Sequence, residues 1–480
     1  MTLAEATFAG PSSWFRQVGL GEVGLGRSPV GLDTPPFPGT GGGLPPKDSA
    51  EYYSARAALD QHRHRQLSPP AAARDLPAYT FAGGDDTKFI ERLGYLQYAH
   101  IYVGTPPVPF LVALDTGSDV FWLPCRCQNC SSYFMTSRGK IVNLNSYEPG
   151  SSSTSEVLLC NSSYCSEPCP LPAAPTPPPC PYEINYMFEN TLSRGFLVQD
   201  LMHLETYTNH NATKIHPPVV FGCGEVETGL FLGRGDLNGL LGLGHTSLDV
   251  TTLLSSQGLI RNSFSMCFAP DGNGRIAFGD KGDADQRVTP LVDARASAQY
   301  VRVDRIYVND VVTDVGFEAM FDSGTSLTYL AGEAYAVVTK AFVSLVKDQQ
   351  RIELVHPFFE YCYIPGTGNN ASFGIPSLIF NTKGGANFSV MSPMFSIKIP
   401  QQVYCLAIVN NKINTLNIIG HNYLTGYRII FDRERSILGW KPSNCISKEA
   451  NTTASNASVL SAMESILFFF LVSFSFSHVM

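Results

Sequence analysis

Two short stretches of the chain, "LDTGSDVFWL" (residues 114–123) and "FDSGTSLTYL" (residues 321–330), decide the fold. In each, apolar residues lead into a single Asp, which is followed by a hydroxyl residue, Gly and a second hydroxyl residue before the chain turns apolar again. An acid in this position is expected to emerge at a turn immediately after a buried strand. The two copies indicate an internal duplication.

Each copy is followed by an apolar-apolar-Gly element, in "GLLGLG" (239–244) and in "NIIGHN" (417–422). A single Asp-Thr-Gly is more often an ordinary turn or helix N-cap. Four pieces in the same order, two in each half, instead favour a pair of catalytic acids, Asp115 and Asp322. "GLLGLG" also resembles a phosphate-binding loop, but it lacks the following Lys-Ser/Thr, so no nucleotide or other cofactor is expected.

The composition favours a β-rich protein of several units. The chain has 480 residues, of which 15% are charged, with 42 Gly and 33 Pro, and its length suggests two or three domains. Short apolar runs broken by Gly, Pro, Asn and Asp recur from about residue 95 to 445, which is typical of an all-β fold. The net charge of −8 and the lack of a basic block argue against a nucleic-acid partner.

The twelve cysteines predict disulfides in an oxidising compartment. They are Cys125, Cys127, Cys130, Cys160, Cys165, Cys169, Cys180, Cys223, Cys267, Cys362, Cys405 and Cys445. Zinc is the competing interpretation for the first three, which are close enough in sequence to share a metal. No second pair with finger-like spacing follows them, so no metal site is expected.

Export is also indicated by seven Asn-x-Ser/Thr sequons. They begin at Asn129, Asn161, Asn211, Asn370, Asn387, Asn451 and Asn456. No N-terminal signal peptide is readable, since residues 1–45 contain no uninterrupted apolar segment behind basic residues. At the other end, small residues at 456–458, a spacer and an apolar stretch at 466–476 have the order of a signal exchanged for a GPI anchor. We therefore expect a secreted protein or one held on the outer face of the plasma membrane.

Taken together, the paired motifs make the chain resemble the pepsin-like aspartic proteases over about residues 95–445. The cysteine-rich insert and the probable anchor are most similar to the plant secreted, nepenthesin-type branch. This resemblance implies a bilobal fold, with two pseudo-twofold-related β lobes, a cleft between them, a polypeptide substrate and a monomeric protein. The expected organisation is an N-terminal region and possible propeptide (1–92), an N-terminal lobe (93–290), a C-terminal lobe (291–445), and a linker with the anchor signal (446–480).

The chemistry expected of the pair is hydrolysis of a peptide bond by one shared water. One carboxylate, Asp115 or Asp322, deprotonates the water while the other, protonated, polarises the carbonyl. Two unit charges ~3 Å apart at an effective dielectric of ~20 repel by roughly 5 kcal/mol, so the pair must share one proton. Activity is therefore expected at acidic pH.

Other residues of the motifs would support the two acids. Glycines let the loops approach closely, and hydroxyls brace the loops or bind the acids. These residues are Thr116, Gly117, Ser118, Ser323, Gly324 and Thr325. The family's flap Tyr would be Tyr186, with Tyr182 as the alternative, and Trp122 would support it through its indole N–H.

The N-terminal half carries about thirty extra residues between its motifs, largely in the Cys- and Pro-rich segment from Cys125 to Cys180. Such an insert could dock a partner or protect against proteolysis. The alternative function is a catalytically inactive, protease-like binding or inhibitor protein. Loss of either acid would favour that alternative, and here both are present.

Overall fold

The computed structural model describes residues 76–446 except 91–92, 136–140, 166–168, 170–175, 187–189, 208–211, 233–237, 293–297, 347–348, 354–358, 366–373 and 400. The expected propeptide, apart from its last residues, and the expected anchor signal lie outside this range. So do the sequons at Asn211, Asn370, Asn451 and Asn456.

In the first half, strand β4 (Val108–Asp115) delivers Asp115 to the end of a buried sheet. Its last residues before the acid, Val112 to Leu114, are fully buried, and β3 (Leu96–Val103) pairs with it antiparallel. On the other side β14 (Leu240–Gly242) runs parallel to β4, with Gly242 opposite Asp115. The apolar-apolar-Gly element of the sequence is therefore the strand next to the acid.

The first sheet contains seventeen hydrogen-bonded strands. Its other members are β1 (Tyr79–Phe81), β2 (Asp86–Ile90), β5 (Trp122–Asn129), β8 (Glu156–Val157), β9 (Pro181–Asn185), β10 (Leu192–Leu201), β11 (Leu204–Thr206), β12 (Lys214–Ile215), β13 (Pro218–Glu227), β15 (Ser263–Phe268), β16 (Asn273–Phe278), β17 (Arg287–Pro290), β29 (Tyr427–Asp432) and β30 (Ile437–Pro442). A separate pair is formed by β6 (Tyr133–Met135) and β7 (Ile141–Asn143).

The second half repeats the arrangement around Asp322. Strand β19 (Val311–Phe321) leads into the acid, and β28 (Asn417–Ile419) runs parallel to it with Ile419 opposite Phe321. The order of this seven-stranded sheet is β24-β23-β18-β19-β28-β20-β27. The other members are β18 (Tyr300–Val308), β20 (Thr328–Leu330), β23 (Leu378–Thr382), β24 (Asn387–Ser389) and β27 (Ile408–Asn410). A four-stranded sheet follows, made of β21 (Gln350–Ile352), β22 (Cys362–Ile364), β26 (Gln401–Leu406) and β25 (Met394–Ile399).

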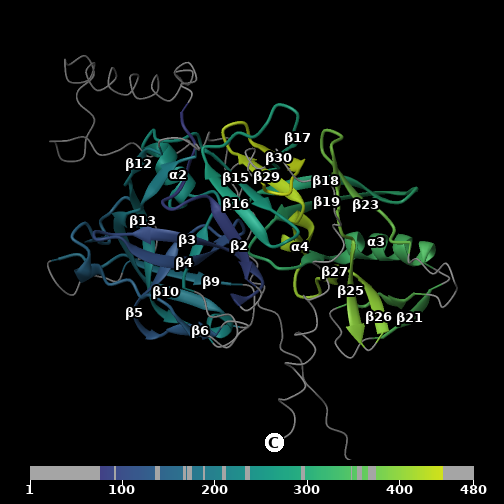
Figure 1. Ribbon diagram of the computed structural model, residues 1–480, viewed down its shortest axis with the longest axis horizontal. Coiled ribbons are helices and arrows are strands. Elements are labelled where there is room, and N and C mark those ends of the chain that lie inside the picture. The colour runs from purple at the N-terminus through teal and green to yellow at the C-terminus, as the bar shows by residue number, and fades with distance from the viewer. Residues whose placement is uncertain are drawn as a thin grey trace, which may run out of the picture. The chain divides into compact units, whose positions relative to one another are not determined.

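The two halves are joined by strands from the end of the chain. β29 pairs with β15, and β30 pairs with β17 and β29, so the last strands return to the sheet of the first half. In Figure 1 these yellow strands lie between the purple and teal lobe and the green lobe. The expected all-β, two-lobed architecture is confirmed.

Helices are short and few among the described residues. They are α2 (Val250–Ser256), α3 (Gly332–Leu345) and α4 (His421–Leu424), with 3-10 turns η2 (Pro149–Ser151) and η3 (Gly229–Phe231). The N-cap of α2 is Asp249, whose side chain accepts from Thr252 N. None of the helices in the described ranges has the length and apolar character needed to cross a membrane.

The body also begins earlier than the boundary expected at residue 93. β1 pairs with β11, and β2 pairs with both β16 and β3. The buried ring of Phe81 packs edge-on against Phe278. These strands are only three and five residues long, so their sequence offers little periodicity from which to predict them.

Disulfides tie the lobes internally. Five pairs are described: Cys125–Cys223, Cys160–Cys169, Cys165–Cys180, Cys267–Cys445 and Cys362–Cys405. Cys130 is also disulfide-bonded, and the side chain of Cys127 lies outside the described residues. Cys160–Cys169 and Cys165–Cys180 lie in the Pro-rich part of the insert. Cys125–Cys223 joins β5 to β13.

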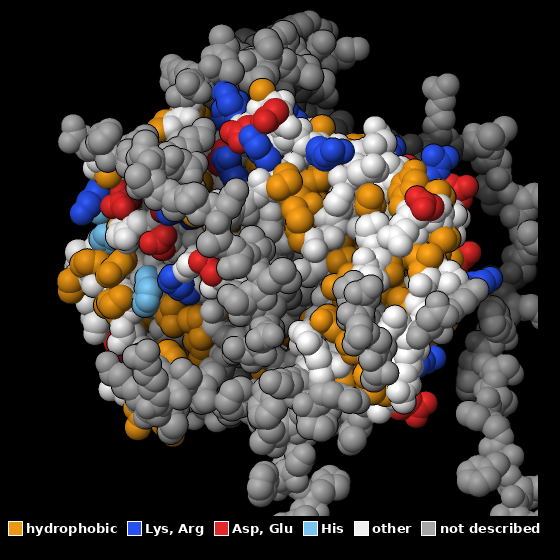
Figure 2. Space-filling model, turned by 45° about the vertical axis from the view of Figure 1, so that its right-hand side comes forward, with side chains coloured by type: hydrophobic (Ala, Val, Ile, Leu, Met, Phe, Trp, Pro, Cys, Tyr) orange, Lys and Arg blue, Asp and Glu red, His pale blue; other side chains and the backbone are white. Residues whose placement is uncertain are grey.

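The surface carries mixed charge. Among the described residues on the face shown in Figure 2, basic and acidic side chains are mostly close to one another in small groups. Apolar side chains occupy the surface between these groups. Exposed ion pairs of the described residues include Arg305–Asp314 and Lys412–Glu360. Exposed pairs of this kind contribute little to stability.

The longest disulfide loop yields a stability prediction. Cys267–Cys445 joins residues 178 apart, whereas Cys160–Cys169 joins residues 9 apart. In the chain-entropy description, closing the long loop stabilises by about 5 kcal/mol and closing the short loop by about 3 kcal/mol. Replacing both cysteines of the long pair by Ser should therefore lower the urea midpoint more than the same change in the short pair. Equal midpoints would contradict this.

Candidate active site

The two aspartates meet because a glycine of each loop lies against the carboxyl group of the other. A Cβ added at Gly324 would lie 2.1 Å from Asp115 Oδ1, and one added at Gly117 would lie 2.7 Å from Asp322 Cγ. Any side chain at either glycine would occupy the space of the opposing acid. Both acids are buried, with 5% of Asp115 and 4% of Asp322 exposed.

Reciprocal hydrogen bonds hold the two loops together beneath the acids. Thr116 Oγ1 donates to Phe321 O at 2.8 Å and accepts from Ser323 N at 3.0 Å. Ser323 Oγ donates to Leu114 O at 2.7 Å and accepts from Thr116 N at 3.2 Å. Each hydroxyl thus binds the backbone of the opposite lobe. Ser at position 323 forms the same kind of bonds as the Thr at 116.

The carboxyl group of Asp115 is oriented by its own loop. Gly117 N donates to Asp115 Oδ1 at 2.8 Å, and Ser118 Oγ donates to Oδ2 at 2.5 Å. Both oxygens therefore accept a hydrogen bond from the loop, which fixes the orientation of the carboxyl group.

Asp322 is held by its own loop in the same way. Gly324 N donates to its Oδ1 at 2.8 Å, and Thr325 Oγ1 donates to its Oδ2 at 2.5 Å. Burial, followed by the neighbouring charge of Asp115, raises the pKa of Asp322 to about 8. Both effects favour the protonated form of this carboxyl group.

Tyr186 lies at the Asp115 side of the site, directly after β9. Trp122 Nε1 donates to its hydroxyl oxygen at 2.8 Å. The ring of Phe231 packs edge-on against Tyr186 at 4.9 Å and contacts Trp122 at 5.2 Å. Burial and the charge of Asp115 raise the pKa of Tyr186 well above its usual range, so its hydroxyl stays protonated. No feature of the sequence predicts that the ring of Phe231 packs against both of these side chains.

Tyr182 occupies a different environment. It is 5% exposed, and its hydroxyl lies 2.9 Å from Ser193 Oγ. Its ring fills the space in front of Gly222, where an added Cβ would lie 2.4 Å from Tyr182 Cζ. The structure thus brings Tyr186 to Trp122, and it places Tyr182 in the core of the lobe.

Two titratable groups next to the motifs were not singled out from the sequence. Asp119 accepts from His245 N at 3.0 Å, and burial raises its pKa to about 6. His421, directly after the Gly of "NIIGHN", is fully buried, which lowers its pKa to about 3. Its ring stacks on Phe89 at 4.5 Å, and its Nε2 lies 3.2 Å from Gln97 Oε1. Neither position differs in sequence from an ordinary loop residue.

The contact between Gly324 and Asp115 can be tested with one methyl group. Gly324→Ala would drive Cβ into Asp115 Oδ1, so we expect it to lower the free energy of unfolding by about 1–3 kcal/mol, as overpacking does. Gly374→Ala is the matched control, since an added Cβ there meets nothing within 4 Å. Urea unfolding of both variants is the measurement. Equal stability would show that the two loops are further apart than described.

Comparisons with known proteins agree with this geometry. Family models described as xylanase inhibitor N-terminal and xylanase inhibitor C-terminal match residues 98–280 and 299–442. Aspartyl protease family protein 1 of Arabidopsis thaliana is 44% identical over 432 residues, which cover 88% of this chain and 82% of the relative. Aspartic proteinase nepenthesin-1 of Nepenthes gracilis is 25% identical over 369 residues, or 72% of this chain and 77% of the relative.

Solved structures show the same fold at lower sequence identity. Conglutin gamma, a basic 7S globulin from lupine seeds, has a TM-score of 0.60 and 21% identity, covering 77% of this chain and 95% of its own. Basic 7S globulin from soybean gives the same TM-score and identity, with 77% and 96% covered. The family models, the relatives and the paired Asp loops together show that the chain belongs to the pepsin-like aspartic protease family, on its plant, nepenthesin-type side.

Proposed function

We propose that the protein is an active aspartic endopeptidase that cleaves polypeptides with a water bound between Asp115 and Asp322. The supporting observation is the close approach of each loop glycine to the opposing carboxyl group. This approach puts two acids within reach of one small molecule, one of them with a pKa raised to about 8. A pair in which one acid is protonated and the other ionised is what peptide hydrolysis by an activated water requires.

The proposed reaction has two steps, and in each step one carboxyl group gains a proton while the other loses one. Asp115 takes a proton from the water as the water oxygen attacks the scissile carbonyl carbon, while Asp322 donates its proton to the carbonyl oxygen. The tetrahedral intermediate then collapses: the C–N bond breaks, the amine nitrogen gains a proton from Asp115, and Asp322 recovers its proton from the hydroxyl. Tyr186, held by Trp122 at 2.8 Å, would cover the substrate. No metal or cofactor takes part in this scheme.

A binding or inhibitor role is the second candidate. It is favoured by one observation: both family models that match the chain carry the description of a xylanase inhibitor. Against it stand the two acids and the hydroxyl and amide donors that hold each of them. A protein that only binds has no need of a buried acid with a raised pKa, since burying such a group costs free energy.

Asp322→Asn tests catalysis directly. We expect it to lower kcat for an unfolded protein substrate at acid pH by about 10²–10⁴-fold, because the general acid is lost. In the unchanged protein, activity should fall as pH rises through the pKa of Asp322, about 8, since its protonated form is needed. The measurement is the pH profile of the mature protein.

Asp314→Asn is the matched control for this test. Asp314 is on β19, the strand that leads into Asp322, but its side chain is 79% exposed and pairs with Arg305. Its variant should keep full activity. Undiminished cleavage by Asp322→Asn would rule out the dyad, and an unmodified protein that cleaves nothing would favour the binding role.

The proposed location is the outer face of the plasma membrane, with a GPI anchor replacing the C-terminal apolar stretch and the N-terminal region removed as a propeptide. Five described disulfides support an oxidising compartment. A phosphatidylinositol-specific phospholipase applied to intact plant cells should release the protein, and mass mapping should place its C-terminus near 456–458. Retention on the cells, with residues 466–476 still present, would exclude the anchor.

A further inference from the structure

Arg433, the residue after β29, is a buried cation close to the site. Its side chain is 0% exposed, as is that of its partner Asp249, and the two form an ion pair at 2.7 Å between Nη1 and Oδ1. The guanidinium also lies over the ring of Phe264 at 5.0 Å. Arg433 comes from the strands that join the lobes, whereas Asp249 caps α2 in the first half. The pair therefore connects the end of the chain to the lobe that carries Asp115.

This ion pair is poorly explained by stability alone. Among the described residues, Arg433 Nε and Asp249 Oδ2 are buried without a hydrogen-bond partner. Burying two charges is costly unless their polar atoms are fully satisfied, and apolar replacements of such pairs are often as stable. A pair kept under these conditions suggests a role in fixing the geometry of its neighbours.

The neighbours of Arg433 are the carbonyl groups that follow β14. Its Nη2 donates to Leu243 O at 2.7 Å and also to Gly244 O. Gln299 Nε2 approaches the first of these carbonyls at 3.4 Å. One guanidinium nitrogen thus binds two successive carbonyl groups of the "GLLGLG" segment.

The amide groups of the same peptides point to the Asp115 loop. Gly244 N donates to Ser118 O at 2.8 Å, and His245 N donates to Asp119 Oδ1 at 3.0 Å. A peptide unit joins the C=O of one residue to the N–H of the next. Two consecutive peptide units, 243–244 and 244–245, are therefore each bound by Arg433 on one side and by the loop on the other. Hydrogen bonds chained through a peptide in this way strengthen one another.

We propose that Arg433 is a positioning residue for the candidate active site, acting through these two peptide units on the loop that carries Asp115. A third bond completes the support, since Leu243 N donates to Asp115 O at 2.7 Å. The inference rests on the proposed peptidase function for its kinetic consequence. The structural link itself does not depend on that function.

The link between Arg433 and the loop also carries a positive charge. Arg433 binds Asp249 through one nitrogen and the carbonyl groups through the other, so the positive end of the pair faces the loop. The charged or titratable groups that face Arg433 are Asp249, Asp119 and His245. Burial and this cation lower the pKa of His245. The same cation lowers the pKa of Asp119, against the larger effect of burial, which raises it.

Among the described residues of the second half, no cation lies in the equivalent place. There His421 N donates to Thr325 O at 2.8 Å, and Asn422 N donates to Ser326 O at 3.2 Å. The His421 side chain is neutral, because burial lowers its pKa to about 3. The charged support is thus found beside Asp115, and a neutral one beside Asp322. This difference matches the assignment of the shared proton to Asp322.

The test removes both charges together. In Arg433→Met/Asp249→Asn no buried charge is left unpaired, and Asn still caps α2. We expect a fall in kcat of about tenfold with little change in KM, as for a misplaced catalytic group. Arg433→Lys, which keeps the charge but not the fork of donors, should restore only part of kcat.

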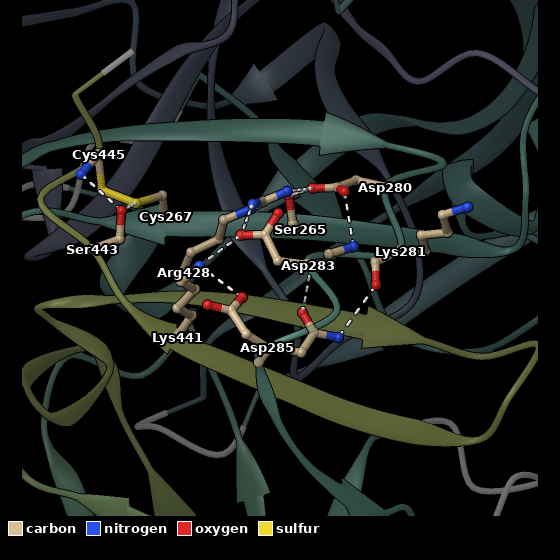
Figure 3. A network of polar contacts seen from close by, with 12 residues as sticks. Ser265, Cys267, Asp280, Lys281, Asp283, Asp285, Arg428, Lys441, Ser443 and Cys445 are labelled. Carbon is tan, nitrogen blue, oxygen red and sulfur yellow. Dashed lines mark hydrogen bonds and ion pairs between the residues drawn. A yellow bond between two sulfur atoms is a disulfide. The ribbon is translucent and has the colours of Figure 1, made fainter. Parts of the chain in front are cut away.

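The matched control uses the ion-pair network of Arg428, on the same strand. Figure 3 shows Arg428 directed at Asp280 and Asp283, with Lys441 and Asp285 beside them. These partners belong to the segment after β16 and to β30, and not to either Asp loop. Arg428→Met/Asp280→Asn should therefore leave kcat and the pH profile unchanged, whatever it does to stability.

The outcomes separate the inference from the function. If the unmodified protein cleaves and the Arg433 double variant has the same kcat, the inference is overturned and the function stands. If the unmodified protein cleaves nothing, the function fails, and the ¹³C chemical shift of the Asp115 carboxyl is followed instead by NMR of ¹³C-labelled Asp, assigned with Asp115→Asn. A changed chemical shift in the Arg433 double variant but not in the Arg428 double variant supports the inference, and an unchanged shift in both overturns it.

Discussion

The close contact between two glycine-containing loops is the constraint on which the rest of the structure depends. Gly117 and Gly324 each leave room only for the carboxyl group of the opposite lobe. This arrangement places two acids together where their mutual repulsion opposes it, so each loop must be held by other bonds. Thr116 and Ser323 supply these bonds by crossing to the opposite backbone. The two lobes can carry a shared site because neither loop is complete without the other.

The duplicated halves are alike in topology but not in what supports them. In each half the acid ends a buried strand, and a parallel strand lies beside it. Behind the first, Arg433 supplies a buried positive charge, whereas behind the second His421 is neutral. Under the proposed reaction, these different supports would give the two acids different roles, as general acid and base catalysis requires.

The sequence predicted those features that are encoded locally. Asp115 and Asp322 were proposed because a strand, an acid and a tight turn follow one another within ten residues, and Trp122 and Tyr186 because of the resemblance to the protease family. Arg433 was not found, since its partner Asp249 is 184 residues away and a charged residue in a turn looks like a solvated one. The early strands β1 and β2 were missed because segments of three and five residues are too short to show a periodicity.

Membership of the family does not by itself decide between cleavage and binding, because the fold persists when catalysis is lost. What distinguishes cleavage from binding is the free energy that a protein loses by holding these two acids in a buried site. A buried carboxyl group with a raised pKa, placed against a second carboxyl, disfavours folding at neutral pH, and a binding protein gains nothing from it. The hydroxyl and amide donors on both acids, and the unsatisfied ion pair behind one of them, are further costs. Their joint presence is most simply explained by a reaction that needs one proton shared between two fixed acids.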